Sequence, residues 1–144
     1  YIYAAMAADC HDKDMPGAAA WFHVQAGEEM GHAQCIYHYI LEREGRVVFE
    51  GLSKPQTEWG SVLDIFKAAY GHEQHITQCI YDLVSQARKE GDHASEAFLN
   101  WFVSEQVEEE ANALAVVRKL EKIGDSKQGL YMIDRELGAR GANH

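Results

Sequence analysis

Residues 18–44 read AAAWFHVQAGEEMGHAQCIYHYILERE and decide the fold, because apolar side chains recur every three or four positions through most of the stretch. That spacing predicts one long helix with a single buried face, which stops at Gly45. The predicted buried face consists of Phe22, Gln25, Glu29, His32, Ile36, and Tyr39 or Ile40. An acid and an imidazole therefore stand where a helix in a packed core normally carries apolar residues.

Sparse turn signals divide the rest of the chain into further helices. They are predicted over residues 1 to about 13, 62 to about 89 with Ser61 as N-cap, about 94 to 122, and roughly 129–137. Residues 45–60, which contain Pro55, are predicted to be extended, and the polar tail 138–144 is predicted to be frayed.

The connection at 45–60 is the feature that predicts the architecture. A helix of about 27 residues is roughly 40 Å long, and about 15 extended residues reach roughly 50 Å, so this connection can cross a whole bundle. Short turns on either side of one long crossover predict an all-α four-helix bundle with a short fifth helix. The length of 144 residues predicts a single domain, 1–144.

Composition narrows the function classes. The formal net charge of −10 disfavours nucleic acid and anionic membranes as partners and favours cations. No apolar run approaches the roughly 18 to 20 residues of a membrane span, which favours a cytoplasmic protein without a membrane partner. Cys10, Cys35 and Cys79 form an odd set without a CxxC pair, which predicts free, partly buried thiols in a reducing compartment.

Two other predicted helices also carry acids on their buried faces. The face of 62–89 runs Val62, Phe66, Ala69 or Tyr70, Glu73, Ile76, Ile80 and Leu83, and the face of 94–122, continued to Ile123, runs Phe102, Gln106, Glu109, Ala113, Val116, Leu120 and Ile123. A single such Glu is most simply a misjudged face or a side chain reaching solvent at the bundle end.

Three mid-helix carboxylates are harder to explain in this way, because several buried acids repel one another and each loses hydration. A bound multivalent cation would offset both effects. Glu29 and His32 have the i, i+3 spacing that brings their side chains to one point, and carboxylate with imidazole suits iron or manganese. The sequence therefore predicts a metal site that includes Glu29, His32, Glu73 and Glu109, with Gln106 one turn before Glu109.

Other polar residues leave alternatives open. Glu28, Glu105, Glu108 and Glu110 form either a solvated face or a second acidic cluster that holds an accessory cation. Tyr3 is a core-packing residue or, less simply, serves the metals by redox chemistry or hydrogen bonding. The remaining histidines of the helices are interpreted as surface or packing residues: His23, His38, His72, His75 and His93.

Four motifs, in order and spacing, resemble those of bacterial non-haem ferritins. They are GEEMGHA, YGHEQHIT, WFVSEQVEEE and GLYMIDREL, which begin at residues 27, 70, 101 and 129. The resemblance implies a ferritin-like four-helix bundle that assembles into a 24-subunit cage around an iron mineral, with the last helix at the four-fold axes. It also implies that Fe(II) is oxidised to Fe(III) by dioxygen or hydrogen peroxide at a di-iron ferroxidase centre.

The resemblance further implies a role for each candidate residue. Glu29 would bridge the two irons and His32 would complete one site, with Glu73 and Glu109 on the other and Gln106 close by. The implied third iron site consists of Glu28, Glu105 and Glu108 with Glu109. Tyr3 matches the tyrosine beside the centre.

Two departures shape these expectations. The haem-binding relatives, bacterioferritins, would have Glu and His where this chain has Gln106 and Glu109, so haem is not expected. Met30 stands where bacterioferritins have their haem-ligating Met, but non-haem ferritins also tolerate Met there. This residue therefore does not distinguish the two groups. The family's first helix begins about 20 residues earlier and carries a terminal Glu ligand about four residues before Tyr1. We therefore expect the sequence to contain only part of the family's first helix.

The alternative functions are a storage cage with an impaired centre, a haem-binding relative, and a metal-free assembly module.

Overall fold

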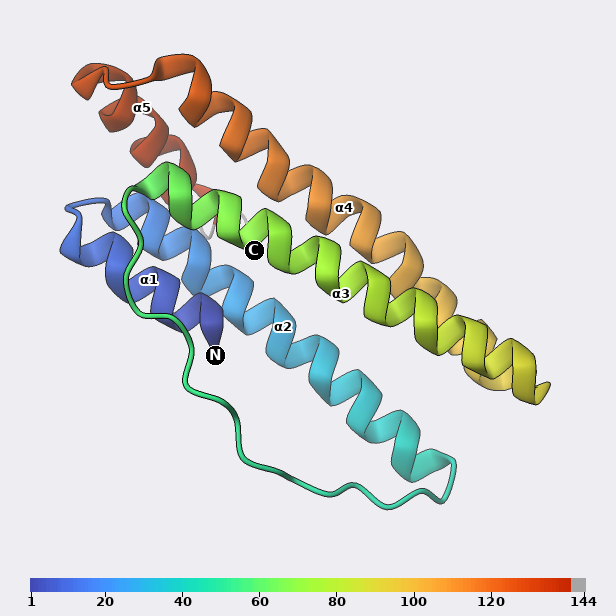
Figure 1. Ribbon diagram of the computed structural model, residues 1–144. Coiled ribbons are helices and arrows are strands. Elements are labelled where there is room, and N and C mark those ends of the chain that lie inside the picture. Colours follow the sequence, from blue (N-terminus) through green and yellow to red (C-terminus); the bar gives the residue numbers. More distant parts are fainter. Residues whose placement is uncertain (141–144) are drawn as a thin grey trace. The chain divides into compact units, whose positions relative to one another are not determined.

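The computed structural model describes residues 1–140 and consists of five helices, with no strand in that range (Figure 1). They are α1 Ile2–Asp12, α2 Pro16–Glu42, α3 Val62–Glu90, α4 His93–Ile123 and α5 Lys127–Gly138. All five predicted helices are confirmed, and their ends lie within two residues of the prediction. Within the described range, none of the helices is both long enough and apolar enough to cross a membrane.

The helices form two compact units. The first unit contains residues 1–62 together with the segment that starts at Lys127, and so holds α1, α2, the long connection and α5. The second unit contains residues 63–126, which are nearly all of α3 and the whole of α4.

In the first unit, α1 and α2 run antiparallel around a tight turn (Figure 1). Asp14 takes a positive φ of 56° in this turn, and the N–H of Met15 donates to the carbonyl of Cys10 at 3.0 Å, so the carbonyls at the end of α1 are satisfied. Pro16 then occupies the first turn of α2, where its missing N–H is no loss. The core of this unit includes six fully buried apolar residues: Met6, Ala7, Cys10, Ala18, Ala19 and Phe22.

The contact of α5 with the start of α2 depends on two glycines and one acid. Asp134 Oδ1 accepts a hydrogen bond of 2.9 Å from the backbone N–H of Ala18, in the first turn of α2. A Cβ on Gly17 would lie 1.8 Å from the backbone oxygen of Asp134, and one on Gly138 would lie 3.3 Å from Gly17 Cα. The helices therefore approach so closely that position 17 has no room for a side chain.

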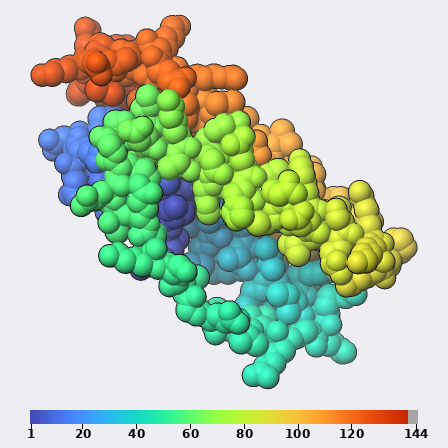
Figure 2. Space-filling model, viewed as in Figure 1, coloured from blue at the N-terminus to red at the C-terminus, as the bar shows by residue number. Residues whose placement is uncertain are grey.

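The connection between α2 and α3 is extended, as predicted, and most of it lies at the surface (Figure 2). The C-terminal end of this connection is fixed by Asp9 of α1, whose side chain is buried. Asp9 Oδ2 accepts from the backbone N–H of Trp59 at 3.0 Å, and Oδ1 accepts from Lys13 Nζ at 2.8 Å. Trp59 is buried as well, so this residue attaches the connection to the core of the unit.

In the second unit, α3 and α4 run antiparallel around Gly91, whose φ of 68° suits glycine (Figure 1). Asp92 caps α4, because its Oδ1 accepts from the Ser95 N–H at 3.1 Å and its Oδ2 accepts from the Ser95 hydroxyl at 2.6 Å. Two ion pairs connect the helices: Lys67 with Glu121 at 3.0 Å, and Arg88 with Glu96 at 2.6 Å.

Most positions of the predicted buried faces of α3 and α4 are confirmed. Ile76 and Ile123, however, are only partly buried, and Thr77 is buried next to Ile76. Val62, Phe66, Ala69, Glu73 and Ile80 are buried. So are Phe102, Gln106, Glu109, Ala113, Val116 and Leu120 of α4. Leu83, however, is 50% exposed, and Val84 is buried in its place. After Ile80 the helix continues its face by a step of four residues rather than three, which the pattern alone does not determine.

The structure also tests the predictions for the three cysteines and for the C-terminal tail. The three cysteines are free: Cys10 is buried, Cys35 is exposed and Cys79 is partly exposed. The expectation of fraying from residue 138 was wrong for residues 138–140, because Gly138 ends α5 and Arg140 contacts α2. The rest of the predicted frayed tail, 141–144, lies outside the described residues.

Candidate metal centre

In the first unit, three polar residues of α2 follow one another along one helix face. Gln25, Glu29 and His32 are spaced i, i+4 and i+7, which places them on a single stripe. Gln25 Nε2 donates to Glu29 Oε1 at 3.3 Å, and His32 Nδ1 lies 3.4 Å from Glu29 Oε2. Gln25 is fully buried, whereas the side chain of Glu29 is 33% exposed and that of His32 is 17% exposed.

This arrangement holds both oxygens of one carboxylate between an amide and an imidazole. If His32 donates its Nδ1 proton to Glu29, the acceptor lone pair of the ring is on Nε2, the tautomer suited to binding a metal through Nε2. The i, i+3 pair that the sequence predicted, Glu29 with His32, is thus brought together within the first unit.

In the second unit, the amide of Gln106 joins α4 to α3. Its Nε2 lies 3.1 Å from Glu73 Oε2, 3.2 Å from the Glu73 carbonyl and 3.3 Å from Thr77 Oγ1, so its N–H groups are shared among three acceptors. Thr77 in turn donates its hydroxyl to Glu110 Oε1 at 2.6 Å. An amide is neutral and cannot offset the charge of Glu73, although it orients one of its oxygens.

Burial sets these acids apart from ordinary surface carboxylates. Glu73 is 3% exposed, and Gln106 and Glu109 are each 4% exposed. Glu109 lies one helical turn beyond Gln106, on the same face of α4. The sequence-based interpretation that these side chains are buried is therefore confirmed, and the alternative of a misjudged face does not apply to Glu73 or Glu109.

Tyr3 lies in the core of the first unit. It is 3% exposed, and its ring stacks on Phe22 of α2 with a centroid distance of 6.0 Å and an interplanar angle of 24°. This contact supports the packing interpretation. The role beside the irons that the resemblance implies stays a prediction.

The four acids of the proposed accessory cluster have different surroundings. Glu28 pairs with Arg140 at 2.6 Å, and Glu110 accepts the hydroxyl of Thr77. Glu105 is partly exposed and Glu108 is exposed, both on α4. Glu28 and Glu110 thus each have a partner within their own unit, and the choice between a solvated face and an accessory cation site stays a prediction.

Sequence reasoning missed several residues that shape these sites. Thr77 ends the motif YGHEQHIT and is one turn from Glu73, so its position on the buried face was a usable signal. Arg140 and Asp134 gave no such signal, because the residues they contact are more than a hundred positions away in the sequence.

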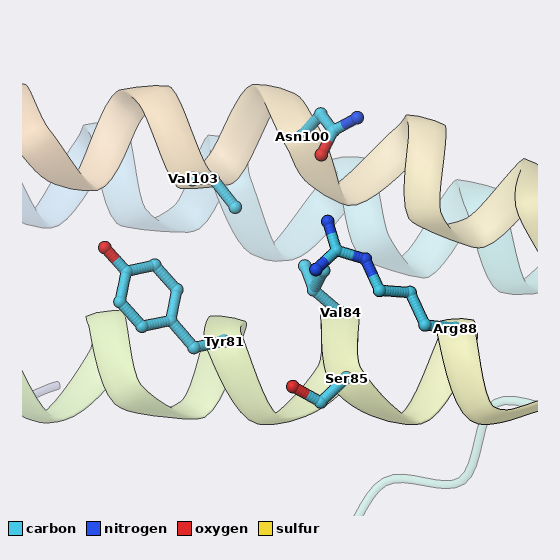
Figure 3. A pocket seen from close by; sticks show the side chains of 6 residues that line it. All are labelled: Tyr81, Val84, Ser85, Arg88, Asn100 and Val103. Carbon is cyan, nitrogen blue, oxygen red and sulfur yellow. The ribbon is translucent and has the colours of Figure 1, made fainter.

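A pocket in the second unit is lined by residues of α3 and α4 (Figure 3). Tyr81, Val84, Ser85 and Arg88 of α3 line it with Asn100 and Val103 of α4. The charge of its one basic residue, Arg88, is offset by the ion pair with Glu96.

Comparison with known proteins identifies the family. The family of ferritin-like domains matches residues 1–123. The chain belongs to the ferritin family. It is 41% identical over 140 residues to the bacterial non-heme ferritin of Staphylococcus aureus, an alignment that covers 97% of this chain and 84% of the relative. The corresponding protein of Staphylococcus saprophyticus is equally similar, with the same coverage.

Solved ferritin structures support the same assignment. An open pore ferritin from the archaeon Archaeoglobus fulgidus superposes with a TM-score of 0.96 at 41% identity, over 97% of this chain and 86% of that one. A closed form engineered from the same archaeal ferritin gives the same TM-score. The fold of this ferritin is thus a ferritin-like four-helix bundle, α1 to α4, with a short C-terminal helix, which confirms the fold class expected from the sequence.

Proposed function

We propose that this ferritin stores iron and oxidises Fe(II) to Fe(III) at a di-iron centre formed by Glu29, His32, Glu73 and Glu109. The observation that carries the proposal is the burial of Glu73, Gln106 and Glu109 in the middle of two helices of a ferritin-family chain. In a four-helix bundle, metal sites are built from acids that point inward from facing helices. The Glu29–His32 pair on α2 has the matching Glu-x-x-His spacing.

In this proposal the iron ions are substrate, and the residues have separate roles. Glu29 bridges two Fe(II) ions about 3.5 to 4 Å apart, as in other two-metal sites. His32 completes one ion's ligand set and Glu73 with Glu109 serves the other. Gln106 orients Glu73 through its 3.1 Å hydrogen bond. Anionic oxygens favour the harder Fe(III) product, so the ligand set promotes oxidation.

The reaction balances with an external oxidant. Two Fe(II) ions release two electrons, and dioxygen takes them with two protons to give hydrogen peroxide. Hydrogen peroxide as the oxidant instead takes two electrons and two protons to give two waters. The Fe(III) product then passes to a mineral inside a 24-subunit cage in the cytoplasm, with α5 at the four-fold axes. Glu28, Glu105 and Glu108, with Glu109, form the accessory iron site, and Tyr3 acts beside the centre.

Anaerobic Fe(II) titration followed by stopped-flow oxidation tests the proposal. We expect two tight Fe(II) sites per chain, weaker binding at the accessory site, and a fast oxidation phase that both Glu29→Ala and Glu109→Ala abolish. Helix content and assembly should be retained, because removing a buried acid relieves repulsion in the metal-free protein. Glu42→Ala, an exposed acid on α2, is the control and should oxidise at the wild-type rate. Unchanged initial rates in both site variants would contradict the assignment.

The same measurements separate the alternatives. A cage with an impaired centre would bind Fe(II) but show no fast saturable phase. A metal-free assembly module would bind no Fe(II) at stoichiometric concentration.

A further inference from the structure

Arg140, just beyond the end of α5, contacts three residues of α2 at once. Its Nη2 donates to Glu28 Oε2 at 2.6 Å, and its Nη1 donates to Gln25 Oε1 at 2.9 Å. Its guanidinium lies over the Trp21 ring, 4.4 Å from the centroid. The three partners follow at i, i+4 and i+7 along one stripe of α2, and the Arg140 side chain is only 19% exposed. Arginine has the rigid, planar donor group that such a site requires.

The contact with Glu28 places the positive charge of the Arg140 guanidinium beside one of two adjacent acids, Glu28 and Glu29. Glu28 is 35% exposed, so the ion pair with Arg140 is partly screened by solvent. A divalent cation that approaches Glu28 competes with the guanidinium for the same carboxylate. Arg140 therefore weakens cation binding at Glu28 without preventing it.

The contact with Gln25 fixes the orientation of an amide. Because Arg140 Nη1 requires an acceptor, the carbonyl oxygen of Gln25 faces it, and the amide nitrogen then faces Glu29 Oε1 at 3.3 Å. The reversed amide would set two donors together at Arg140 and two acceptors together at Glu29. Arg140 thus acts on Glu29 through Gln25, although it does not touch Glu29.

We propose that Arg140 is a positioning residue that gives the adjacent acids Glu28 and Glu29 different roles. It retains Glu28 as its ion-pair partner, so that the accessory cation binds there only by displacing Arg140. Through Gln25 it holds Glu29 in the orientation used for the di-iron centre. The inference rests on the proposed function, because it concerns the same two metal-binding positions.

Calorimetric titration with Zn(II), a redox-inert probe, tests this inference in the assembled protein. Arg140→Met removes the charge and both donors, and we expect the accessory site to bind Zn(II) roughly two- to fivefold more tightly, the range expected for a partly exposed ion pair. Loss of the Gln25 contact should weaken one of the two tighter sites. Arg135→Met, an exposed arginine of α5, is the matched control and should bind as the wild type does.

Two further variants separate charge from geometry. Arg140→Lys keeps the charge without the planar fork, so we expect the accessory site to stay weak while the tighter site still loses affinity. Adding Glu28→Gln to Arg140→Met should remove the gain at the accessory site, because its carboxylate is gone.

The outcomes distinguish the two proposals. Two tight sites in every variant, with the accessory affinity unchanged in Arg140→Met, would overturn the role of Arg140 and leave the di-iron centre standing. No Zn(II) binding in the wild type would overturn the proposed function itself, and the role of Arg140 with it.

Discussion

Asp134 of α5 caps the first turn of α2 from outside that helix, through the 2.9 Å hydrogen bond that it accepts from the Ala18 N–H. The residue before α2, Met15, has no side chain that could cap it, and no side-chain cap is made from that position. The first N–H groups of a helix have no partner within the helix, and a carboxylate there also interacts favourably with the helix dipole. The fifth helix therefore supplies what the local sequence of α2 lacks.

Asp134→Ala should lower the free energy of unfolding by about 1 kcal/mol, the usual effect of removing an N-terminal cap. Urea titration at fixed protein concentration measures this, since assembly makes stability depend on concentration. Asp125→Ala, which removes an exposed acid between α4 and α5, serves as control and should change stability by less than about 0.5 kcal/mol. Equal losses in the two variants would argue against the capping role.

Gly17→Ala should separate α5 from α2. The new Cβ would lie 1.8 Å from the Asp134 backbone oxygen, so the backbone must shift, at a cost of about 1 to 3 kcal/mol. Gly71→Ala on α3 is the opposite control, because a Cβ there meets nothing within 4 Å, and it should stabilise by about 0.5 to 1 kcal/mol. Changes of opposite sign in the free energy of unfolding, relative to the wild type, would confirm the steric argument.

Asp9→Asn should release the long connection from α1. The variant keeps the shape of the side chain but loses its charge and one acceptor oxygen, which weakens the bonds from Trp59 and Lys13 by about 2 kcal/mol together. Limited proteolysis within residues 45–60, read with the fluorescence of Trp59, should detect the release. Asp12→Asn, an exposed acid of the same helix, should leave cleavage rates unchanged.

The cysteines should differ sharply in reactivity toward iodoacetamide at pH 8. Burial, and next the charge of Asp9, raises the pKa of the Cys10 thiol from 9.0 to about 12, so the reactive thiolate is scarce in the folded chain. Cys35 is exposed and should be alkylated first. Alkylation of Cys10 as fast as Cys35 in the native state would contradict this ordering.

The same pKa shift makes stability depend on pH. Above pH 9 the unfolded chain ionises Cys10 while the folded chain keeps it protonated, so the unfolded state binds fewer protons. Between about pH 9 and 12, this group should lower the free energy of unfolding by up to about 1.4 kcal/mol per pH unit. Urea titrations of the wild type and Cys10→Ala should show a shallower pH dependence in the variant.

How far the sequence could predict the site depends on which residues share a helix. Glu29 with His32, and Gln106 with Glu109, were predictable because side chains three positions apart lie on one helix face. The burial of Glu73 and Glu109 followed from the same periodicity. The periodicity failed at Ile76 and Leu83, because steps of three and of four residues are both compatible with a helical face, and only packing selects Thr77 and Val84.

The sequence by itself determined the five helices, the extended connection and the mid-helix acids, because each depends on local propensity and a repeat of 3.6 residues. Tertiary structure alone decided that Asp134 caps α2, that Asp9 fixes Trp59, and that Arg140 pairs with Glu28 rather than with another acid. These contacts join residues 50 to 116 positions apart, and no periodic pattern relates such positions. Their partners are chosen by where α5 and the connection pack, which depends on the shape of the whole first unit.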